Sequence, residues 1–445
     1  MRRALLAAFA AVSVAASAAA PRLTESEARG KAIFFHGRSD APLTARIGEE
    51  NLEVAASVVP CASCHGYDGR GRRESGVAPP SVRWDDLITP YAVGERRHPP
   101  YTASSLKRAV AMGVDPAGNR LQSVMPRYQL SQRDMSDLIA YLRKLPADAD
   151  PGLTDSAIRI AVVLLPGERA EPVRKVVESY FAKLNESGGV FNRRIDVAFG
   201  ATTAELDRLG PFAILAPTLI GSADGFEAYA ADHEIPLIAA IAVTPPRSRS
   251  SFHLLPGLNE QAATLFEAFP DAAVVYKDAP PFRDAALALH ASTLLTDPAK
   301  AAARKAVVVI GPASLQREVL RIASAMEPPP AVLIPGVLSV IDPAEIPEKV
   351  RPFVRTAVPL LPSDVQPAAF EELRALGVTQ TSPTLIGALA TSKIAVETLR
   401  RAGHDLTREK LIETLETLYE TDTALMPRIT FSEARHVGIV KAHVQ

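Results

Sequence analysis

Short apolar runs alternate with stretches of helical pattern over the C-terminal part of the chain. Most of these runs are rich in Val and Ile, and most are followed by apolar residues at helical spacing. The runs cover residues 158–165, 213–216, 236–243, 272–276 and 306–310. This alternation is typical of βαβ units, in which the crossover helix makes neighbouring strands parallel. The pattern therefore predicts an α/β fold with parallel sheets over residues 156–445.

The chain before residue 146 has a different residue pattern, in which Gly and Pro are scattered between short helical patterns. Residues 106–112 and 130–142 carry apolar positions at helical spacing, and no strand–helix alternation accompanies them. Between the two parts, residues 147–155 are rich in Pro, Asp and Gly and lack an apolar period, which predicts a linker. We therefore expect an all-α domain over residues 22–146 and a separate α/β domain over residues 156–445.

Residues 1–20 have the order of a secretory signal peptide. Arg2 and Arg3 precede an Ala-rich apolar run over residues 4–12, which is followed by mostly small residues. Pro21 disfavours cleavage directly before it, so we place the cleavage near Ala18. An uncleaved anchor is the alternative, but the run is shorter and more Ala-rich than a membrane span of about 20 strongly apolar residues. The sequence predicts a periplasmic protein with no membrane span after cleavage.

Composition and charge exclude several classes of protein. The chain has 445 residues, of which 47% are hydrophobic and 22% charged, so it is neither fibrous nor tail-like. Its 49 basic and 50 acidic side chains nearly cancel, whereas nucleic-acid binders normally show a strong basic excess. The chain has 2 cysteines, too few for a disulfide scaffold. We predict no nucleic-acid partner, and the spacing of the cysteines becomes the informative feature.

The two cysteines belong to a C-x-x-C-H motif, in which His65 directly follows Cys64 and Cys61 lies three residues earlier. On one helical turn both thiols can reach the two vinyl groups of a haem, and the adjacent imidazole can meet its iron. A thioredoxin-like dithiol would need a βαβ context, and a four-cysteine zinc site would need a second cysteine pair. We therefore predict one covalently bound haem c, attached to Cys61 and Cys64 and ligated by His65.

A second axial ligand from a Met thioether is usual in electron-transfer haems, because it stabilises the ferrous iron. The domain offers Met112, Met125 and Met135 as candidates. Met112 ends a helical run, and Met135 lies on the apolar face of the 130–142 pattern, which indicates core packing. Met125 precedes Pro126 in a loop, where the proline restricts it to an extended conformation. We predict Met125 as the second axial ligand.

Residues 22–146 resemble a class I cytochrome c domain, of the kind that serves periplasmic dehydrogenases. The resemblance rests on an early helix, the C-x-x-C-H motif with glycines behind it, a proline loop, a Met-Pro loop and a closing helix. The matching segments cover residues 29–34, 61–71, 76–80, 105–118, 125–128 and 134–145. In the family, a loop proline carbonyl accepts a hydrogen bond from the ligand histidine, which implies Pro79 or Pro80 here. Three side chains are candidates to hold the haem propionates, to pack, or to lie on the surface as solvated groups: Trp84, Arg127 and Tyr128. Two further histidines could act as alternative ligands, but surface or loop roles are favoured for both: His36 and His98.

Residues 156–445 resemble the periplasmic-binding-protein type I family, in particular its branched-chain amino-acid receptors. The matching segments cover residues 158–162, 184–197, 213–217, 234–239, 390–403 and 427–436. Proteins of this family have two α/β lobes joined by a hinge. They hold their ligand between the lobes, at the carboxyl ends of strands and the amino ends of helices. The resemblance therefore implies a two-lobed fold with a small-molecule site.

The family's binding residues carry over poorly to this sequence. The loops that grip the ligand in the family correspond to residues 218–222 and 239–244, where polar groups are sparser. The Tyr-Gly pattern of the second lobe is replaced by a different segment, which begins at Tyr276. These differences make an ordinary α-amino acid a poor candidate ligand. The cleft candidates that remain are Ser222, Thr244 and Tyr276.

Together these features predict a periplasmic electron carrier rather than an enzyme. Its haem would exchange electrons with a periplasmic redox partner, for which the family resemblance suggests a quinoprotein dehydrogenase. The second domain would sense a small molecule or dock the partner. The alternative is a solute-binding receptor of an ABC importer that carries an accessory haem domain. A Met ligand leaves no open iron position, which argues against haem-based turnover.

Overall fold

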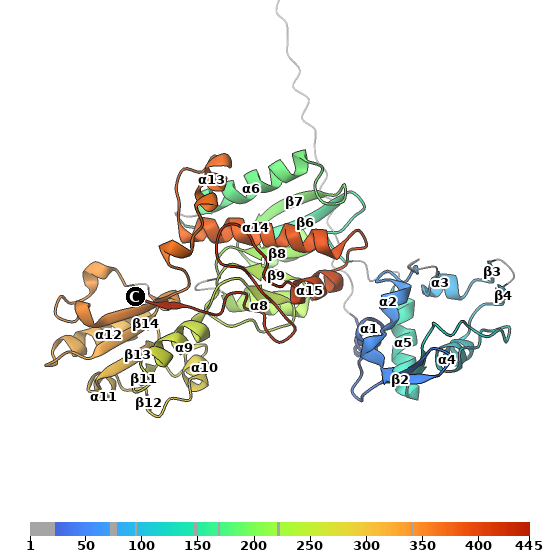
Figure 1. Cartoon of the computed structure of the whole chain (residues 1–445), viewed down its shortest axis with the longest axis horizontal. Helices are drawn as coiled ribbons and strands as arrows, with labels where there is room; N and C mark the ends of the chain where they lie inside the picture. The colour runs from blue at the N-terminus through green and yellow to red at the C-terminus, as the bar shows by residue number, and fades with distance from the viewer. Residues whose placement is uncertain are drawn as a thin grey trace, which may run out of the picture.

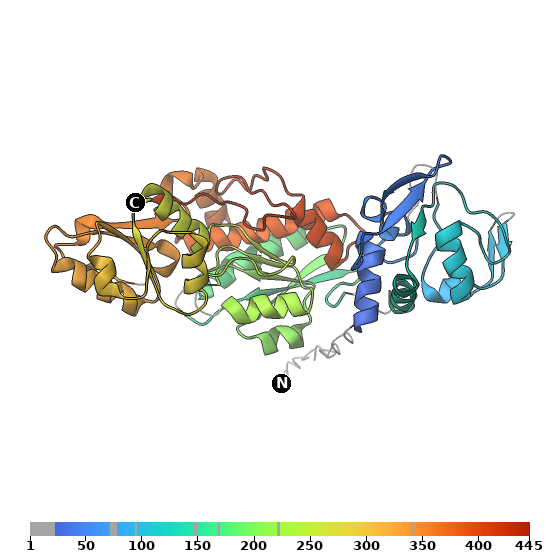
Figure 2. The same cartoon turned by 90° about the horizontal axis from the view of Figure 1, so that it is seen from below.

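The computed structural model describes residues 23–71, 78–93, 96–145, 150–167, 170–219, 223–339 and 341–445. They form three bodies in a row: an N-terminal domain, a first lobe in the middle and a second lobe at the far end (Figure 1, Figure 2). The predicted signal peptide over residues 1–20 and the cleft candidate Ser222 lie outside the described residues. Within the described ranges, no helix has the length and hydropathy that a membrane span requires.

The N-terminal domain is built around the crossing of its first and last helices, α1 (Glu25–His36) and α5 (Gln132–Lys144). Gly30 lies at this crossing, where an added Cβ atom would be 2.0 Å from the Asp137 carbonyl oxygen, so a larger residue would push the helices apart. Beside it, Arg29 Nε donates to the buried Asp137 carboxylate at 2.7 Å. The remaining helices are α2 (Cys61–His65), α3 (Trp84–Leu87) and α4 (Ala103–Met112), with the 3₁₀ turn η1 (Ala56–Val58).

The N-terminal domain is not purely helical, in contrast to the expectation from the sequence. It contains the short strands β1 (Thr44–Ile47), β2 (Leu52–Ala55), β3 (Tyr91–Val93), β4 (Arg96–His98) and β5 (Arg127–Gln129). β1 pairs antiparallel with both β2 and β5, and β3 pairs antiparallel with β4. Strands of three or four residues are too short to leave a clear alternation of apolar and polar positions in the sequence. The pairing of Ala45 with Tyr128 anchors β5 to the body of the domain.

The first lobe is a parallel sheet with the strand order β10-β9-β8-β6-β7. Its strands are β6 (Ala157–Val163), β7 (Arg194–Gly200), β8 (Ala213–Ala216), β9 (Leu237–Ala239) and β10 (Ser251–His253). Its helices are α6 (Ala170–Glu186), α7 (Thr203–Leu209), α8 (Ala223–Asp232), α13 (Pro367–Ala375), α14 (Pro383–Ala402) and α15 (Arg408–Glu416). Ile160 and Val162 face the core that includes α6 and α14, whereas Ala161 and Val163 face the core that includes α7 and α8. The sheet is therefore covered on both faces.

The second lobe has the strand order β12-β11-β13-β14-β15-β16, in which β16 is antiparallel to β15 and the other pairs are parallel. Its strands are β11 (Ala273–Tyr276), β12 (Leu294–Leu295), β13 (Ala306–Ile310), β14 (Ala331–Pro335), β15 (Val354–Val358) and β16 (His443–Val444). Its helices are α9 (Leu258–Ala268), α10 (Phe282–Ala288), α11 (Pro298–Ala302) and α12 (Ala313–Ser324). Short 3₁₀ turns are η3 (Gly336–Leu338), η4 (Pro343–Glu345), η5 (Arg351–Phe353) and η6 (Pro362–Asp364).

Three segments connect the two lobes. Residues 254–257 join β10 to α9, and residues 359–366 join β15 to α13. The third segment starts at Val437, which bridges to His253 in the first lobe, and ends in β16 of the second lobe. All five apolar runs noted in the sequence contain strands of these two sheets, namely β6, β8, β9, β11 and β13. The chain therefore passes repeatedly between the lobes, and α14 and α15 return to the first one (Figure 1).

Candidate functional site

The C-x-x-C-H motif forms the short helix α2 of the N-terminal domain. Cys61 and Cys64 are free thiols one turn apart, of which Cys61 is partly buried and Cys64 is exposed. Burial raises the pKa of the Cys61 thiol to about 11, although a hydrogen bond with Tyr128 opposes the shift. Two thiols on one turn match the spacing that attachment to two vinyl groups requires.

The imidazole of His65 is buried and held in one orientation. Its Nδ1–H donates to the Pro80 carbonyl oxygen at 2.9 Å, which leaves the lone pair of Nε2 available for a metal. Burial lowers the pKa of His65 and outweighs the opposing effect of that hydrogen bond, so the ring is neutral at pH 7. Of the two prolines that the family resemblance implied, the structure selects Pro80.

Gly71 sets the position of the segment that carries Pro80. Its φ is +88°, and an added Cβ atom would lie 2.0 Å from the Pro79 carbonyl oxygen. The Gly71 amide also donates to the His65 carbonyl oxygen at 2.7 Å. The segment can lie this close to the motif because residue 71 is glycine, and the Pro80 carbonyl thereby reaches His65.

The three candidate methionines lie in different environments. Met112, at the end of α4, is 69% exposed, and Met135 is 4% exposed in the core of the domain. Met125 is partly buried in the loop between α4 and β5, directly before Pro126. A haem ligand must be partly shielded from water and also available to the iron, so these environments disfavour Met112 and Met135.

Arg127 fastens the loop that carries Met125. Its guanidinium donates to the carbonyl oxygens of Met125, of Leu121 at 2.9 Å and of Gln122 at 3.1 Å. The same group fills the space beside Gly113, where an added Cβ atom would lie 2.0 Å from Arg127 Nε. Burial lowers the pKa of Arg127. The sequence offered Arg127 for propionate binding or packing, and no sequence signal pointed to this contact with the loop.

The other two propionate candidates also have contacts within the protein. The Trp84 ring lies 4.5 Å from the guanidinium carbon of Arg143. Tyr128 is buried, which raises the pKa of its phenol, and its hydroxyl donates to the Val59 carbonyl oxygen shortly before α2. Tyr128 thereby connects β5 to the approach to the haem motif.

The two remaining histidines of the domain have contact partners outside α2. His98 is buried and stacks on Tyr91, with ring centroids 5.0 Å apart, and its Nδ1 is 2.8 Å from the Pro99 carbonyl oxygen. His36 ends α1 and lies 3.3 Å from Glu409 of the first lobe. The prediction of a surface or loop role is wrong for His98, which ends β4 and is buried. For His36 the prediction misses the contact with another domain, because this contact joins residues far apart in sequence.

The two described cleft candidates, Thr244 and Tyr276, lie in different lobes. Thr244 is 2% exposed between β9 and β10, and its hydroxyl has no hydrogen-bond partner among the described residues. Tyr276 ends β11 in the second lobe and is partly buried. Within the described residues no hydrogen bond joins Thr244 to Tyr276. Their role in ligand binding stays a prediction.

A cavity of about 480 Å³ lies between the N-terminal domain and the first lobe. Ala62, Ser63 and Tyr67 line it on one side, and His404 and Lys410 line it on the other. The first lobe therefore faces one flank of the haem motif, an arrangement that sequence reasoning did not anticipate.

Comparisons with known proteins found similarities for both parts of the chain. The family described as cytochrome c matches residues 55–146. A fatty acid ABC transporter substrate-binding protein from Thermomonospora curvata is similar in structure, with a TM-score of 0.50 and 16% identity, over 67% of this chain and 90% of that chain. A branched chain amino acid ABC transporter from Thermus thermophilus with bound valine has a TM-score of 0.48 and 17% identity, over 66% of this chain and 93% of that chain. No curated protein matches the chain in sequence.

The two parts of the chain differ in what they match: a family model for the N-terminal part and a fold for the C-terminal part. Residues 55–146 are a cytochrome c domain, and the larger C-terminal part has the fold of the periplasmic binding proteins of type I. α1 precedes the matched residues but packs on α5 in the same core, so the domain begins before residue 55 in the structure. Its donor set, two thiols on one turn and an imidazole with an available Nε2, fits a covalently bound haem.

Proposed function

We propose that the chain is a periplasmic c-type cytochrome that transfers electrons through one covalently bound haem, and that it is an electron carrier rather than an enzyme. The proposed axial ligands are His65 and Met125. The observation that carries the proposal is the fixed imidazole of His65, whose hydrogen bond to Pro80 leaves Nε2 available beside the two thiols. When bound, the haem supplies a one-electron couple between ferrous and ferric iron.

The residues of the domain have separate tasks in this proposal. Cys61 and Cys64 would hold the haem through two thioether bonds, because a thiol can add across a vinyl group with its sulfur on one carbon, its hydrogen on the other and no leaving group. Pro80 keeps the His65 ring in one orientation, and such contacts raise the basicity of a ligand. Arg127 holds the Met125 loop through three carbonyl oxygens. These contacts limit rearrangement when the iron changes its charge.

The experiment that tests this function is the visible spectrum of the periplasmically expressed protein, with a haem stain after denaturing electrophoresis. We expect a stained band and, in the ferric state, the weak far-red absorption of Met-ligated haem. Met125→Ala should lose this absorption and keep the covalent stain. The intact mass of the same sample reports whether residues up to about Ala18 are removed.

Met112→Ala is the matched control, because Met112 is 69% exposed and its loss should leave the far-red absorption unchanged. High-spin iron that binds added ligands in the wild type would contradict Met125 ligation and would reopen catalysis or gas sensing. Absence of the haem stain would contradict the proposal as a whole.

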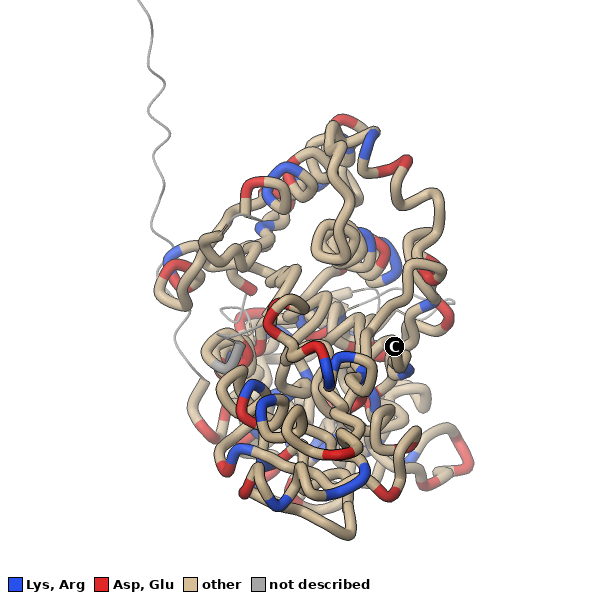
Figure 3. Tube along the Cα trace, turned by 90° about the vertical axis from the view of Figure 1, so that its left-hand side faces the viewer, with Lys and Arg blue, Asp and Glu red and all other residues tan. Residues whose placement is uncertain are grey.

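The redox partner that we propose is a periplasmic dehydrogenase of the quinoprotein class. Basic and acidic positions are interspersed along the chain (Figure 3), and the net charge is −1, so docking would depend on a local patch rather than on an overall field. Mixing the ferric protein with such an enzyme and its substrate should reduce the haem. Absence of reduction would exclude this class of partner and leave the haem assignment intact.

A second candidate function is a solute receptor, and the buried hydroxyl of Thr244 favours it. A buried hydroxyl without a partner costs free energy of about 1–3 kcal/mol, and a bound solute could relieve that cost. Calorimetric melting with branched-chain amino acids and fatty acids as probes tests this function. A probe that raises the melting temperature of the wild type but not of Thr244→Val would support a receptor, and stabilisation of both proteins would exclude a role for Thr244.

A further inference from the structure

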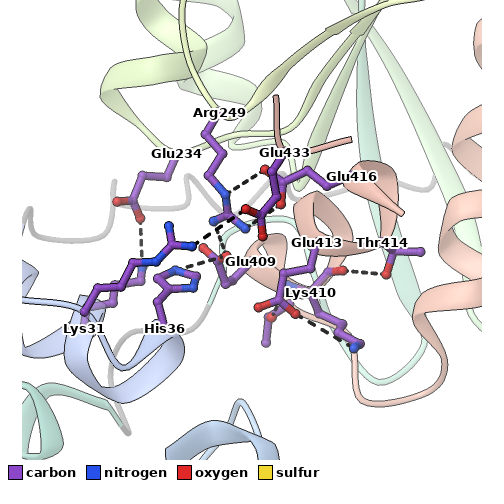
Figure 4. Close-up of polar contacts among 12 residues, drawn as sticks. Lys31, His36, Glu234, Arg249, Glu409, Lys410, Glu413, Thr414, Glu416 and Glu433 are labelled. Atoms are coloured by element: carbon purple, nitrogen blue, oxygen red, sulfur yellow. Dashed lines mark hydrogen bonds and ion pairs between the residues drawn. The ribbon is translucent and has the colours of Figure 1, made fainter. Parts of the chain in front are cut away.

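The N-terminal domain contacts the first lobe through an interface centred on the carboxylate of Glu409 (Figure 4). Glu409 lies on α15, and its side chain is 14% exposed. His36 Nε2 lies 3.3 Å from Glu409 Oε1, and Arg249 Nη1 donates to the same oxygen. His36 belongs to the N-terminal domain, whereas Arg249 precedes β10 in the first lobe. One carboxylate is therefore held by a basic group from each side of the boundary.

Further contacts extend this Glu409 interface in two directions. Tyr67 donates its hydroxyl to Glu413 on α15, and Lys410 Nζ lies 5.3 Å from the centre of the Tyr67 ring. Tyr67 stacks on Phe35 of α1, with ring centroids 5.5 Å apart. At the rim, two further ion pairs cross the boundary: the partly buried Lys31 with Glu234 at 2.9 Å, and the exposed Arg38 with Glu433 at 3.8 Å.

The charges on the two sides are complementary. In the ion pairs that cross the boundary, the N-terminal domain contributes the basic groups Lys31, His36 and Arg38, and the first lobe contributes the carboxylates Glu234, Glu409 and Glu433. The other titratable groups at these contacts are Tyr67, Arg249, Lys410, Glu413, Glu416 and His436. The cavity beside them is also lined by Asp68 and Arg70 of the N-terminal domain and by His404 and Asp405 of the first lobe. Complementary charges favour one docking orientation, and the covalent tether keeps the effective concentration high. Contacts that would be weak between separate proteins can therefore hold the domain in place.

Arg249 connects this interface to the base of the inter-lobe segments. Its Nε and Nη2 donate to the Glu416 carboxylate at 2.8 and 2.7 Å, and His436 Nε2 lies 3.6 Å from the same group. The His253 amide donates to the His436 carbonyl oxygen at 2.8 Å. Both backbone segments then continue into the second lobe. The Glu409 interface therefore rests on a part of the first lobe that is stabilised by hydrogen bonds within that lobe.

His36 Nε2 and carboxylate oxygens of Glu409 and Glu413 lie within 4.8 Å of one another, a spacing that a metal ion could also bridge. Both carboxylates already have partners, because Arg249 donates to Glu409 and Tyr67 donates to Glu413. The arrangement therefore favours direct ion pairing across the boundary.

We propose that the N-terminal domain and the first lobe act as one rigid unit, docked through the Glu409 interface, so that hinge motion moves the second lobe alone relative to the haem motif. The first lobe faces Ala62 of α2, and Tyr67 two residues after that helix, across the cavity, while Cys64 stays exposed. A redox partner accordingly reaches the motif from the side of Cys64. This inference concerns the position of the domain and does not depend on which partner or solute binds.

The test is small-angle scattering of the full-length holoprotein, together with hydrogen exchange of the α15 peptide over residues 408–416. For the wild type we expect a scattering profile that fits the single arrangement of Figure 1. Lys31→Glu/His36→Glu places two carboxylates against Glu234 and Glu409, so it should lengthen the particle. Exchange in α15 should accelerate about tenfold or more, because the covering domain has left.

Lys107→Glu is the control, because Lys107 is an exposed residue of α4 with no contact across the boundary. Glu413→Arg repeats the disruption from the first lobe, so a folding defect confined to the N-terminal domain cannot explain both results. The haem spectrum reports whether that domain remains folded. A chelator should leave the wild-type profile unchanged, and expansion on chelation would instead indicate a metal-bridged interface. A wild type that already behaves as an extended ensemble, or interface variants that keep the wild-type profile and exchange rate, would overturn the proposal.

Discussion

The chemistry at the haem motif depends on residues that carry no reactive group. Gly71 allows the segment of Pro79 to approach within a distance that any Cβ would obstruct, and the Pro80 carbonyl then fixes His65. Arg127 takes no part in the predicted covalent chemistry, yet it holds three carbonyl oxygens of the loop around Met125. The candidate ligands His65 and Met125 were predicted from the sequence, whereas the residues that hold these segments in position follow from contacts between segments.

Gly71→Ala should destabilise the domain and disturb the orientation of His65. The new methyl group would lie 2.0 Å from the Pro79 carbonyl oxygen, and φ of +88° adds strain. We expect a loss of about 2–4 kcal/mol of the free energy of unfolding, from strain and steric clash together. The measurement is denaturant unfolding followed at the haem Soret band.

Gly118→Ala separates these two contributions. Gly118 has a similar φ of +91°, but an added Cβ would meet nothing within 4 Å. It should therefore lose only the strain part, about 1 kcal/mol. Equal losses for the two variants would show that the approach of Pro79 to residue 71 does not matter.

Arg127→Gln should loosen the Met125 loop. The shorter amide cannot reach the carbonyl oxygens of Met125, Leu121 and Gln122 together, so the proposed iron–thioether bond becomes easier to displace. We expect added imidazole to bind the ferric haem about tenfold more tightly, which corresponds to about 1.4 kcal/mol. Spectroscopic titration with imidazole measures this affinity.

Arg120→Gln serves as the comparison, since Arg120 is exposed on the same loop region. Its imidazole affinity should equal that of the wild type. If Arg127→Gln also leaves the imidazole affinity unchanged, Arg127 does not position the loop.

At the scale of elements, the crossing of α1 and α5 defines the N-terminal domain. Glycine is a poor helix former, so Gly30→Ala would normally stabilise an exposed helix by about 1 kcal/mol. Here the added Cβ would lie 2.0 Å from the Asp137 carbonyl oxygen and 2.7 Å from Tyr141 Cβ. We expect a net loss of about 1–3 kcal/mol from overpacking, measured by thermal unfolding.

Ala28→Gly provides the reference for helix propensity, because Ala28 is an exposed residue of the same helix. It should cost about 1 kcal/mol without any change in the crossing. A more stable Gly30→Ala variant would contradict the close approach of the two helices.

The apolar runs predicted strands well where a strand is buried on both faces. The runs at 213–216 and 306–310 coincide with β8 and β13. The runs did not identify β7, β10, β12, β14, β15 and β16. β7 and β15 are only partly buried over much of their length, and β10, β12 and β16 have two or three residues, so none of these leaves a long apolar run. β14 is largely buried, but it ends at Pro335 and the 3₁₀ turn η3 follows, so no helical pattern comes directly after it.

At the scale of the whole molecule, Glu409 makes docking sensitive to acid. Burial opposes its ionisation, but the hydrogen bonds and charges of His36 and Arg249 outweigh burial and lower the pKa of Glu409 from 4.5 to about 2. A carboxyl with a lowered folded-state pKa stabilises the fold above its unfolded pKa, and this stabilisation is lost as the pH falls through the folded value. We expect about 3 kcal/mol at pH 7 to disappear between about pH 4.5 and pH 2.

Urea unfolding of the wild type and of Glu409→Gln from pH 7 to pH 2 checks this expectation. The difference between the two proteins should be largest at neutral pH and should vanish in acid. Glu433→Gln is the control, since the exposed pair of Glu433 with Arg38 at 3.8 Å should contribute less than about 1 kcal/mol at any pH. A difference between wild type and Glu409→Gln that stays constant down to pH 2 would contradict the lowered pKa.

The sequence by itself determined the local chemistry and the order of the elements. All residues of a C-x-x-C-H motif lie within five positions of the chain, and the alternation of strands and helices also depends on neighbouring positions. For the same reason the core position of Met135 could be predicted from the pattern around it.

Only the tertiary structure decided which segments meet. Three contacts illustrate this: His65 with Pro80 rather than Pro79, Arg127 with the Met125 loop, and His36 with Glu409. None of these pairs is marked by a periodic pattern in the sequence. His36 and Glu409 are separated by nearly the whole chain, and their pairing depends on how two folded bodies dock. Docking is set by surface shape and charge, which exist only after each body has folded.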